Sequence, residues 1–222
     1  ERRNEISEIM RNKIKKCSGV IVLDLGTSAF KCGLVSDTLN IIAACKHDVQ
    51  LTKDSGLIEI DFEAAFHTCF ALIRHIIGEA AIKGCRPGAL IITSQAQTFV
   101  PVDHDFKPMT TGISWLDTRA GDEAEFLSQS IVNIPLKMGY RVPSPMLYSS
   151  KLLWLKNHRP EIYRMAHAFP LLNEFIVQRL TSEFYTDYTN FGMTGMLDIG
   201  SRELNQEMLS LLNLRASQFP EL

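Results

Sequence analysis

The segment VIVLDLGTSAFKCGLVS, residues 20–36, decides the fold because it sets two apolar runs on either side of a short polar turn. Residues 20–25 and 31–35 have the aliphatic composition of β-strands, and Gly26 and Thr27 open the turn between them. Asp24 lies at the carboxyl end of the first strand, where side chains and loop amides of α/β sheets converge. A carboxylate there suits a hydrated Mg²⁺ and a polyphosphate, and it equally suits an aspartate that satisfies the N–H groups of its own turn.

The residues that follow extend this pair into an α/β sheet. Residues 39–44 predict a third strand, and Asp61 is a good N-cap for a long amphipathic helix that runs to Gly84. Residues 89–92 form a continuous apolar run, which predicts a strand buried on both faces. The apolar face of the helix is predicted from residues spaced by three or four, namely Phe62, Phe66, Phe70, Ile73, Ile77 and Ala80.

The second half of the chain is predicted to be mainly helical. Ala120, Ala124, Leu127 and Ile131 are spaced as one helix face, and four further helices are expected at residues 151–157, 161–168, 173–180 and 202–212. Pro160 is well placed in the first turn of the second of these four. Because no repeat or linker interrupts the pattern, we expect one compact α/β domain after a basic amphipathic N-terminal extension at residues 1–18.

Composition excludes several classes of function. The 222 residues carry a net charge of −2, which favours neither nucleic acid nor a membrane surface as a partner. The longest apolar runs fall short of a membrane span, so none is predicted. The five cysteines are scattered and mostly apolar in context, which predicts reduced core thiols in a cytoplasmic protein. The six histidines show no spacing typical of a metal site or a triad.

Four segments, in order along the chain, carry a family resemblance. LDLGTSAFKCGLVS, residues 23–36, resembles the first phosphate motif of the superfamily that contains sugar kinases, Hsp70 and actin. PVDHDFKPMTTGISWLDTRAGDEAE (101–125), YSSKLLWLKNHRPEIYRMAHAF (148–169) and LNEFIVQRLTSEFYTDYTNFGMTGMLDI (172–199) resemble segments of the FGGY carbohydrate kinases, which include xylulose, gluconate, ribulose and glycerol kinases. The resemblance runs from about residue 19 to residue 214.

This resemblance implies the actin-like ATPase fold and a nucleotide site. The implied lobe is ribonuclease H-like, with a mixed five-stranded sheet and helices on both faces, and residues 19–222 would form the N-terminal, sugar-binding domain. ATP and Mg²⁺ are the implied cofactors. Asp24 would hold the metal, Gly26 would let the backbone approach the phosphates, and Thr27 would donate to a phosphate oxygen. Lys31 would neutralise phosphate charge, or it is a solvated strand lysine.

The resemblance also implies where the sugar binds. Gln97 is the leading candidate, since an amide offers donors and an acceptor to hydroxyls, and its alternative is an amide that caps the strand end. Trp115 would pack on the carbohydrate and Asp117 would accept from hydroxyls; alternatively Trp115 belongs to the core, with Asp117 as a helix N-cap and Arg119 as its partner. The predicted sugar-side residues are Gln95, Gln97, Trp115, Asp117 and Asn190, the last in a segment that a polar turn explains nearly as well.

The implied function is the N-terminal lobe of an ATP-dependent carbohydrate kinase. It would transfer the γ-phosphate of ATP to a hydroxyl of a sugar, polyol or aldonate, with the base and the adenosine-binding lobe expected beyond this chain's segments. A non-catalytic sugar-binding or regulatory module of the same fold is the alternative, and an actin-like or chaperone ATPase is a third reading. The expected partners are the sugar and ATP, not nucleic acid, and a homodimer is left open.

Overall fold

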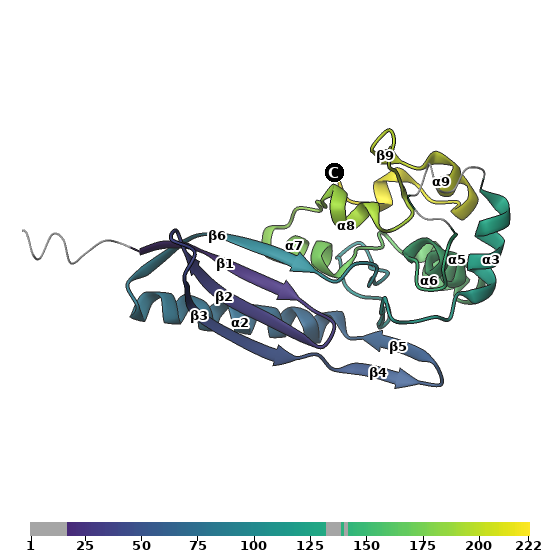
Figure 1. Cartoon of the computed structure of the whole chain (residues 1–222). Coiled ribbons are helices and arrows are strands. Elements are labelled where there is room, and N and C mark those ends of the chain that lie inside the picture. Colours follow the sequence, from purple (N-terminus) through teal and green to yellow (C-terminus); the bar gives the residue numbers. More distant parts are fainter. Residues whose placement is uncertain (1–16, 132–138, 140–141) are drawn as a thin grey trace, which may run out of the picture. The chain divides into compact units, whose positions relative to one another are not determined.

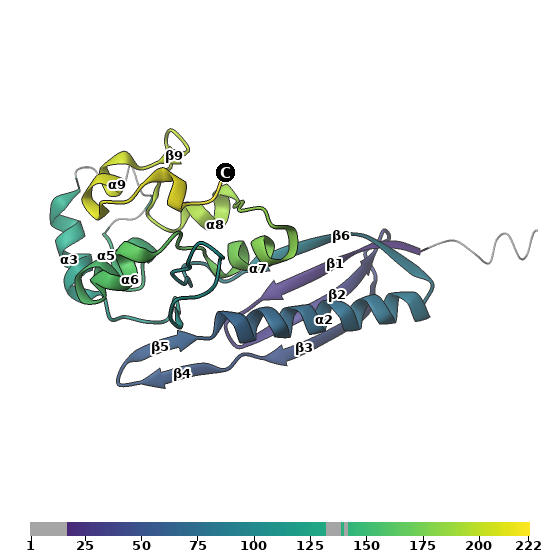
Figure 2. The same cartoon turned by 180° about the vertical axis from the view of Figure 1, so that it is seen from behind.

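The computed structural model describes residues 17–131, 139 and 142–222 (Figures 1 and 2). Their contacts cluster into two compact units. Unit 1 contains residues 17–48 and 68–93 of the described chain, and unit 2 contains residues 49–67 and 94–222 without the undescribed gaps. The predicted N-terminal helix lies outside the described residues, apart from Cys17 and Ser18, which begin the first strand instead.

Unit 1 is built on a four-stranded sheet in the order β3-β2-β1-β6. Its strands are β1 (Cys17–Leu25), β2 (Ala29–Ser36), β3 (Ile41–Asp48) and β6 (Cys85–Ser94). The first three pair antiparallel, as their short connections predicted. The alternation in β1 explains its orientation, because Ile21, Leu23 and Leu25 are buried while Val22 and Asp24 on the opposite face are half-buried.

Helix α2 (Phe62–Ile82) covers one face of this sheet (Figures 1 and 2). Asp61 accepts a hydrogen bond from the Ala64 N–H at 2.9 Å, as expected of an N-cap. The buried face differs from the predicted one, since Phe70 and Ile77 are exposed. The helix is apolar on more than one side, and by length and composition alone it would suffice to cross a membrane, as many core helices would. Its buried line is Phe62, Ala65, Cys69, Leu72, Ile73, Ile76 and Ala80.

Strand β6 is an edge strand rather than the strand buried on both faces that was predicted. Within the described residues it pairs on one side, with β1, and it runs in the same direction as β1 (Figure 1). Leu90 is 37% exposed and Ile91 is 50% exposed. The described sheet of unit 1 therefore has four strands and one covering helix from its own unit, where five strands and helices on both faces were expected.

The prediction of five reduced cysteines was wrong for two of them. Cys17 and Cys85 form a disulfide, with Cα atoms 4.3 Å apart. They begin β1 and β6, and the pairing of these strands brings together residues that are 68 positions apart in sequence. Cys32 and Cys69 are buried free thiols, as predicted, and Cys45 is a half-buried one.

Unit 2 contains a small sheet that the sequence analysis missed. Strands β4 (Leu51–Asp54) and β5 (Leu57–Ile60) form a hairpin, and β7 (Gly112–Ile113) pairs with β5. The turn residues Ser55 and Gly56 have φ angles of +48° and +89°. Glycine readily adopts the left-handed conformation that such a tight hairpin turn requires.

Helices make up most of unit 2 around its own apolar core. The prediction for residues 202–212 was too long, because Asn205 caps the helix by accepting from the Glu207 and Met208 N–H groups. The helix predicted at residues 161–168 ends three residues earlier than expected, at Met165. Pro160 occupies its first turn, as predicted. The elements are α3 (Gly121–Ser130), α5 (Tyr148–His158), α6 (Pro160–Met165), α7 (Leu172–Thr181), α8 (Tyr188–Gly192), α9 (Gln206–Leu212), η1 (Ala216–Gln218), and strands β8 (Leu197–Asp198) and β9 (Glu203–Leu204).

Candidate functional site

The predicted phosphate-side residues lie together at one end of the sheet in unit 1. Asp24 and Lys31 are register partners across β1 and β2, and Lys31 Nζ lies 3.2 Å from Asp24 Oδ2. Both side chains are partly exposed, so the carboxylate is neither sealed in the core nor without a cationic neighbour. Gly26 turns the chain so tightly that a Cβ atom there would lie 2.8 Å from the Ala29 carbonyl oxygen. Thr27 follows it in the same turn, half-buried.

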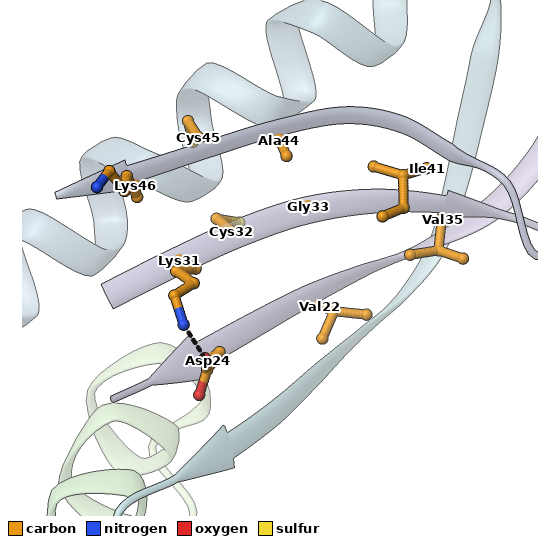
Figure 3. A pocket seen from close by; sticks show the side chains of 10 residues that line it. All are labelled: Val22, Asp24, Lys31, Cys32, Gly33, Val35, Ile41, Ala44, Cys45 and Lys46. Carbon is orange, nitrogen blue, oxygen red and sulfur yellow. Dashed lines mark hydrogen bonds and ion pairs between the residues drawn. The ribbon is translucent and has the colours of Figure 1, made fainter. Parts of the chain in front are cut away.

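A cavity of about 460 Å³ opens beside this pair on the sheet face opposite to Ile21 and Leu23 (Figure 3). Figure 3 shows the side chains of Asp24 and Lys31 meeting at one end, with Val22, Val35 and Ile41 farther along the strands. The cavity is lined by Val22, Asp24, Lys31, Cys32, Gly33, Val35, Ile41, Ala44, Cys45 and Lys46. It therefore combines a charged end with an apolar floor.

Lys46 is a cavity residue that the sequence analysis missed. It is the register partner of Lys31 on β3, so Asp24, Lys31 and Lys46 form one row across three strands. The sequence could not reveal this pairing, because the predicted third strand ended at residue 44 and the β2–β3 register shifts between Leu34 and Val35. The row holds two ammonium groups and one carboxylate, a set that suits a multiply charged anion accompanied by a divalent cation.

The predicted sugar-side residues lie in unit 2, and two of them come together there. Gln97 follows β6, and Trp115 follows β7, and the bridge between Phe99 and Ile113 pairs the two segments. The Trp115 N–H donates to Thr98 Oγ1 at 2.9 Å. Gln97 and Trp115 are both half-buried, so the pair of segments presents an amide and an indole at a partly exposed position. Gln95 is half-buried just before them.

The side chain of Gln97 is partly committed to the protein. Its Oε1 accepts a hydrogen bond from the Tyr148 N–H at 3.0 Å, at the first residue of α5. Within the part of the chain that the structure describes, no hydrogen bond engages its Nε2. The amide thus caps a helix rather than the strand end, and it retains donors that suit a hydroxyl oxygen.

Asp117 is fully buried, which differs from the direct sugar contact that was predicted. Its carboxylate accepts from the Ile58 N–H at 2.6 Å and from Arg119 Nε and Nη2 at 2.8 and 2.7 Å. Burial raises the pKa of Asp117, but these hydrogen bonds outweigh it and hold the pKa below its usual value. The predicted alternative partner, Arg119, is observed, and it also bonds Glu59 at 2.8 Å. The N-cap of α3 is Ala120 rather than Asp117.

Asn190 lies in α8, a short helix where a polar turn was considered. Asp187 caps this helix by accepting from the Asn190 N–H at 2.8 Å. The Asn190 side chain donates to Asn173 Oδ1 at 2.6 Å, and the neighbouring Leu172 N–H donates to the Thr98 carbonyl. Among the described residues, Asn190 is thus linked to the Gln97 segment only through α7.

Comparison with known proteins identifies the family of this chain. The FGGY family of carbohydrate kinases, N-terminal domain, matches residues 19–222. The xylulose kinase of Staphylococcus xylosus is 26% identical over 205 residues, covering 91% of this chain and 42% of that protein. The glycerol kinase of Thermococcus onnurineus is 25% identical over 207 residues, with the same coverage.

Solved structures give the same result. The gluconate kinase of Lactobacillus acidophilus matches with a TM-score of 0.80 at 27% identity, over 92% of this chain and 42% of that one. The Plasmodium falciparum glycerol kinase, solved with ADP, shares the fold with a TM-score of 0.82 at 24% identity, over 92% of this chain and 43% of that one. The chain spans about two fifths of the length of these relatives. It belongs to the FGGY family of carbohydrate kinases and matches their N-terminal domain.

Proposed function

We propose that this chain is the sugar-binding lobe of an ATP-dependent carbohydrate kinase. The reaction would transfer the γ-phosphate of ATP to a hydroxyl of a sugar, polyol or aldonate. The observation that carries the proposal is the family match over residues 19–222, within which Asp24 and Lys31 lie side by side at a cavity. Phosphoryl transfer asks a protein mainly for alignment and charge stabilisation, and this site offers groups of both signs.

On the phosphate side, the residues of unit 1 fit a magnesium-bound polyphosphate. Magnesium commonly uses one or two carboxylates and keeps waters and phosphate oxygens as its other ligands, so the single carboxylate of Asp24 fits it. When bound, the metal would neutralise phosphate charge. Lys31 would exchange its ion pair with Asp24 for a phosphate oxygen, and Thr27 would donate a hydrogen bond. Gly26 would leave the turn backbone open to close approach.

On the sugar side, we propose that Gln97 and Trp115 touch the substrate, with Gln95 and Asn190 beside them. Gln97 would donate from Nε2 to a hydroxyl, and Trp115 would pack its ring on an apolar face of the carbohydrate. Asp117 would act without touching the sugar, because its bonds to Arg119 and Ile58 fix the loop after Trp115. Sugar hydroxyls are neutral, so a site of amides and an indole suits them better than a site of free charges.

Isothermal titration calorimetry of the full-length protein with Mg²⁺-ATP tests the phosphate side. Asp24→Asn and Lys31→Met should each weaken nucleotide binding by about tenfold or more, the cost of one charge-assisted interaction. Lys53→Met, on an exposed part of β4, is the matched control. Titration with D-xylulose, D-gluconate and glycerol tests the sugar side, where Gln97→Ala should weaken sugar binding and spare nucleotide binding. Equal affinities in wild type and Asp24→Asn would remove Asp24 from the site.

A non-catalytic sugar-binding or regulatory module is the second candidate, and the match to a single domain of longer kinases favours keeping it. The two functions differ in phosphate transfer. Incubation of the protein with [γ-³²P]ATP and each of the three sugars should give labelled sugar phosphate if it is a kinase. Sugar binding without any such product in the full-length protein would support the module instead.

Three finer expectations also belong to this proposal. We propose that the sheet of unit 1 is completed to five strands by pairing on the outer side of β6, and that helices cover its second face. We propose a cytoplasmic location because ATP is the phosphate donor, although the Cys17–Cys85 disulfide is more typical of oxidising compartments. A homodimer is proposed as the assembly to be tested by light scattering.

A further inference from the structure

Lys151 of α5 is a fully buried lysine inside unit 2. A buried ammonium is costly unless acceptors surround it, so its position requires an explanation. Its Nζ donates to the Gln97 carbonyl at 3.1 Å and to the Ser114 carbonyl at 2.9 Å. Burial lowers the pKa of Lys151 to about 7, against the opposing effect of Asp117. Two carbonyl acceptors satisfy the two N–H groups of a neutral amine as well as they satisfy part of an ammonium.

These two carbonyls belong to the two segments that carry the sugar-side residues. Gln97 itself supplies one carbonyl, and Ser114, the residue before Trp115, supplies the other. One amine therefore links two segments that are 17 residues apart. The next residues of the same segments, Thr98 and Trp115, are joined by the hydrogen bond from the Trp115 N–H to Thr98 Oγ1. If the amine were removed, the Gln97 carbonyl would have no donor among the described residues, whereas the Ser114 carbonyl would keep the Asp117 N–H at 3.1 Å.

Gln97 needs this tie because its backbone is strained. Its φ is +64°, in the left-handed region that residues other than glycine seldom adopt. Such a conformation persists where the surroundings determine it. Helix α5 supplies two bonds that do so, since the Tyr148 N–H holds the side chain of Gln97 and Lys151, one turn later, holds its carbonyl.

We propose that Lys151 is the positioning residue of the sugar site, which holds Gln97 in its left-handed conformation and fixes its spacing from Trp115. The effect that this inference predicts on sugar binding rests on the proposed function. The effect that it predicts on amide hydrogen exchange does not. Lys151 is buried and touches no substrate. It acts through the two segments that carry Gln97 and Trp115, and so it determines how well a sugar fits between the amide and the indole.

The test compares Lys151→Met with Lys156→Met in the 222-residue chain. Lys156 is the matched control because it lies on the same helix and its Nζ also donates to a carbonyl, that of Leu211 at 3.0 Å. Amide hydrogen exchange is measured by NMR at Trp115 and Tyr148, whose N–H groups bond Thr98 and Gln97. We expect exchange at both amides to rise about tenfold or more in Lys151→Met and to stay unchanged in Lys156→Met.

The sugar readout follows on the same samples. Dissociation constants for D-xylulose, D-gluconate and glycerol should rise about tenfold in Lys151→Met, whereas that for Mg²⁺-ATP should stay unchanged. If wild type binds none of the three sugars, the proposed function fails for these three substrates, and the exchange data still decide the role of Lys151. Equal loss of thermal stability in both variants, with unchanged exchange at Trp115 and Tyr148, would overturn the positioning role.

A readout without substitution covers the case in which Lys151→Met does not fold. Nuclear Overhauser effects in the wild-type chain should connect the Nζ protons of Lys151 with the amide protons of Thr98 and Trp115, which adjoin the two bonded carbonyls. Lys151→Gln, which keeps an N–H donor on a shorter stem, should show intermediate exchange. Absence of both Overhauser effects would contradict the tie.

Discussion

Replacing Glu174 by glutamine should stabilise unit 2 at alkaline pH. Glu174 lies in the first turn of α7, is fully buried, and accepts from the Leu171 N–H through Oε2 at 2.7 Å. Burial raises its pKa from 4.5 to about 7, more than this hydrogen bond lowers it. A glutamine oxygen would accept the same hydrogen bond, and the side chain would carry no charge at any pH.

The sign of the effect follows from proton linkage. A carboxyl group whose pKa is higher in the folded than in the unfolded chain keeps its proton better when folded. The folded state therefore loses stability as pH rises from 4.5 to about 7, and the loss is complete above that range. The interval is about 2.5 pKa units, which sets a ceiling of about 3 kcal/mol on the loss.

Differential scanning calorimetry of both chains from pH 5 to pH 8.5 measures the effect. At pH 8, Glu174→Gln should unfold with a Tm higher by up to about 6–12 °C for the transition of unit 2, and the two curves should converge near pH 5. Glu203→Gln, on exposed β9, is the matched control and should follow wild type at every pH. A gain of the same size at pH 5 and pH 8, or no gain at pH 8, would refute the reasoning.

Two further predictions concern packing and the disulfide. Gly112→Ala should destabilise unit 2 by about 2 kcal/mol or more in urea denaturation, because a Cβ at position 112 would lie 2.2 Å from the Phe62 ring. Gly121→Ala is the control and should be nearly neutral, because a Cβ there would have nothing within 4 Å. Equal effects of the two substitutions would contradict this prediction. Alkylation in denaturant without reductant should modify three cysteines and leave Cys17 and Cys85 unmodified, and reduction should then lower stability by about 4 kcal/mol; five modified cysteines before reduction would exclude the disulfide.

Local patterns in the sequence predicted which segments form helices and strands better than they predicted which faces of these elements are buried. Residues 20–36 specified the β1–β2 pair because alternation and a glycine turn are encoded within one short segment. The long helix from Asp61 was also predicted correctly, because its N-cap and its apolar spacing are encoded within one segment. Its buried face was misread because α2 is apolar on several sides, so that periodicity permits more than one choice of face, and Phe70 and Ile77 are exposed.

Features that depend on contacts distant in sequence were harder to predict. An apolar run such as residues 89–92 fits an edge strand as well as a central one, and strand order decides between them. The Cys17–Cys85 pair required knowledge that β1 and β6 are neighbours. The Asp117–Arg119 pair was accessible as an alternative because it is local.

The sugar-side residues show the same limit. Gln97 was chosen from its position after a strand, but nothing in the sequence indicates that its backbone is left-handed. Lys151 stands among leucines in a helix, where a lysine usually extends its head group to solvent. Only the structure shows its Nζ between two carbonyls.

Among the described residues, β6 pairs with β1 alone, and this has a practical consequence for production of the 222-residue chain. Where no fifth strand occupies the outer side of β6, its backbone groups beside the exposed Leu90 and Ile91 form a template on which another copy can add a strand, the common origin of edge-to-edge aggregation. We expect the yield of monomer in size-exclusion chromatography to fall with concentration. The charged substitution Ile91→Lys should restore the yield of monomer. An unchanged proportion of oligomer in that variant would show that a different surface causes the association.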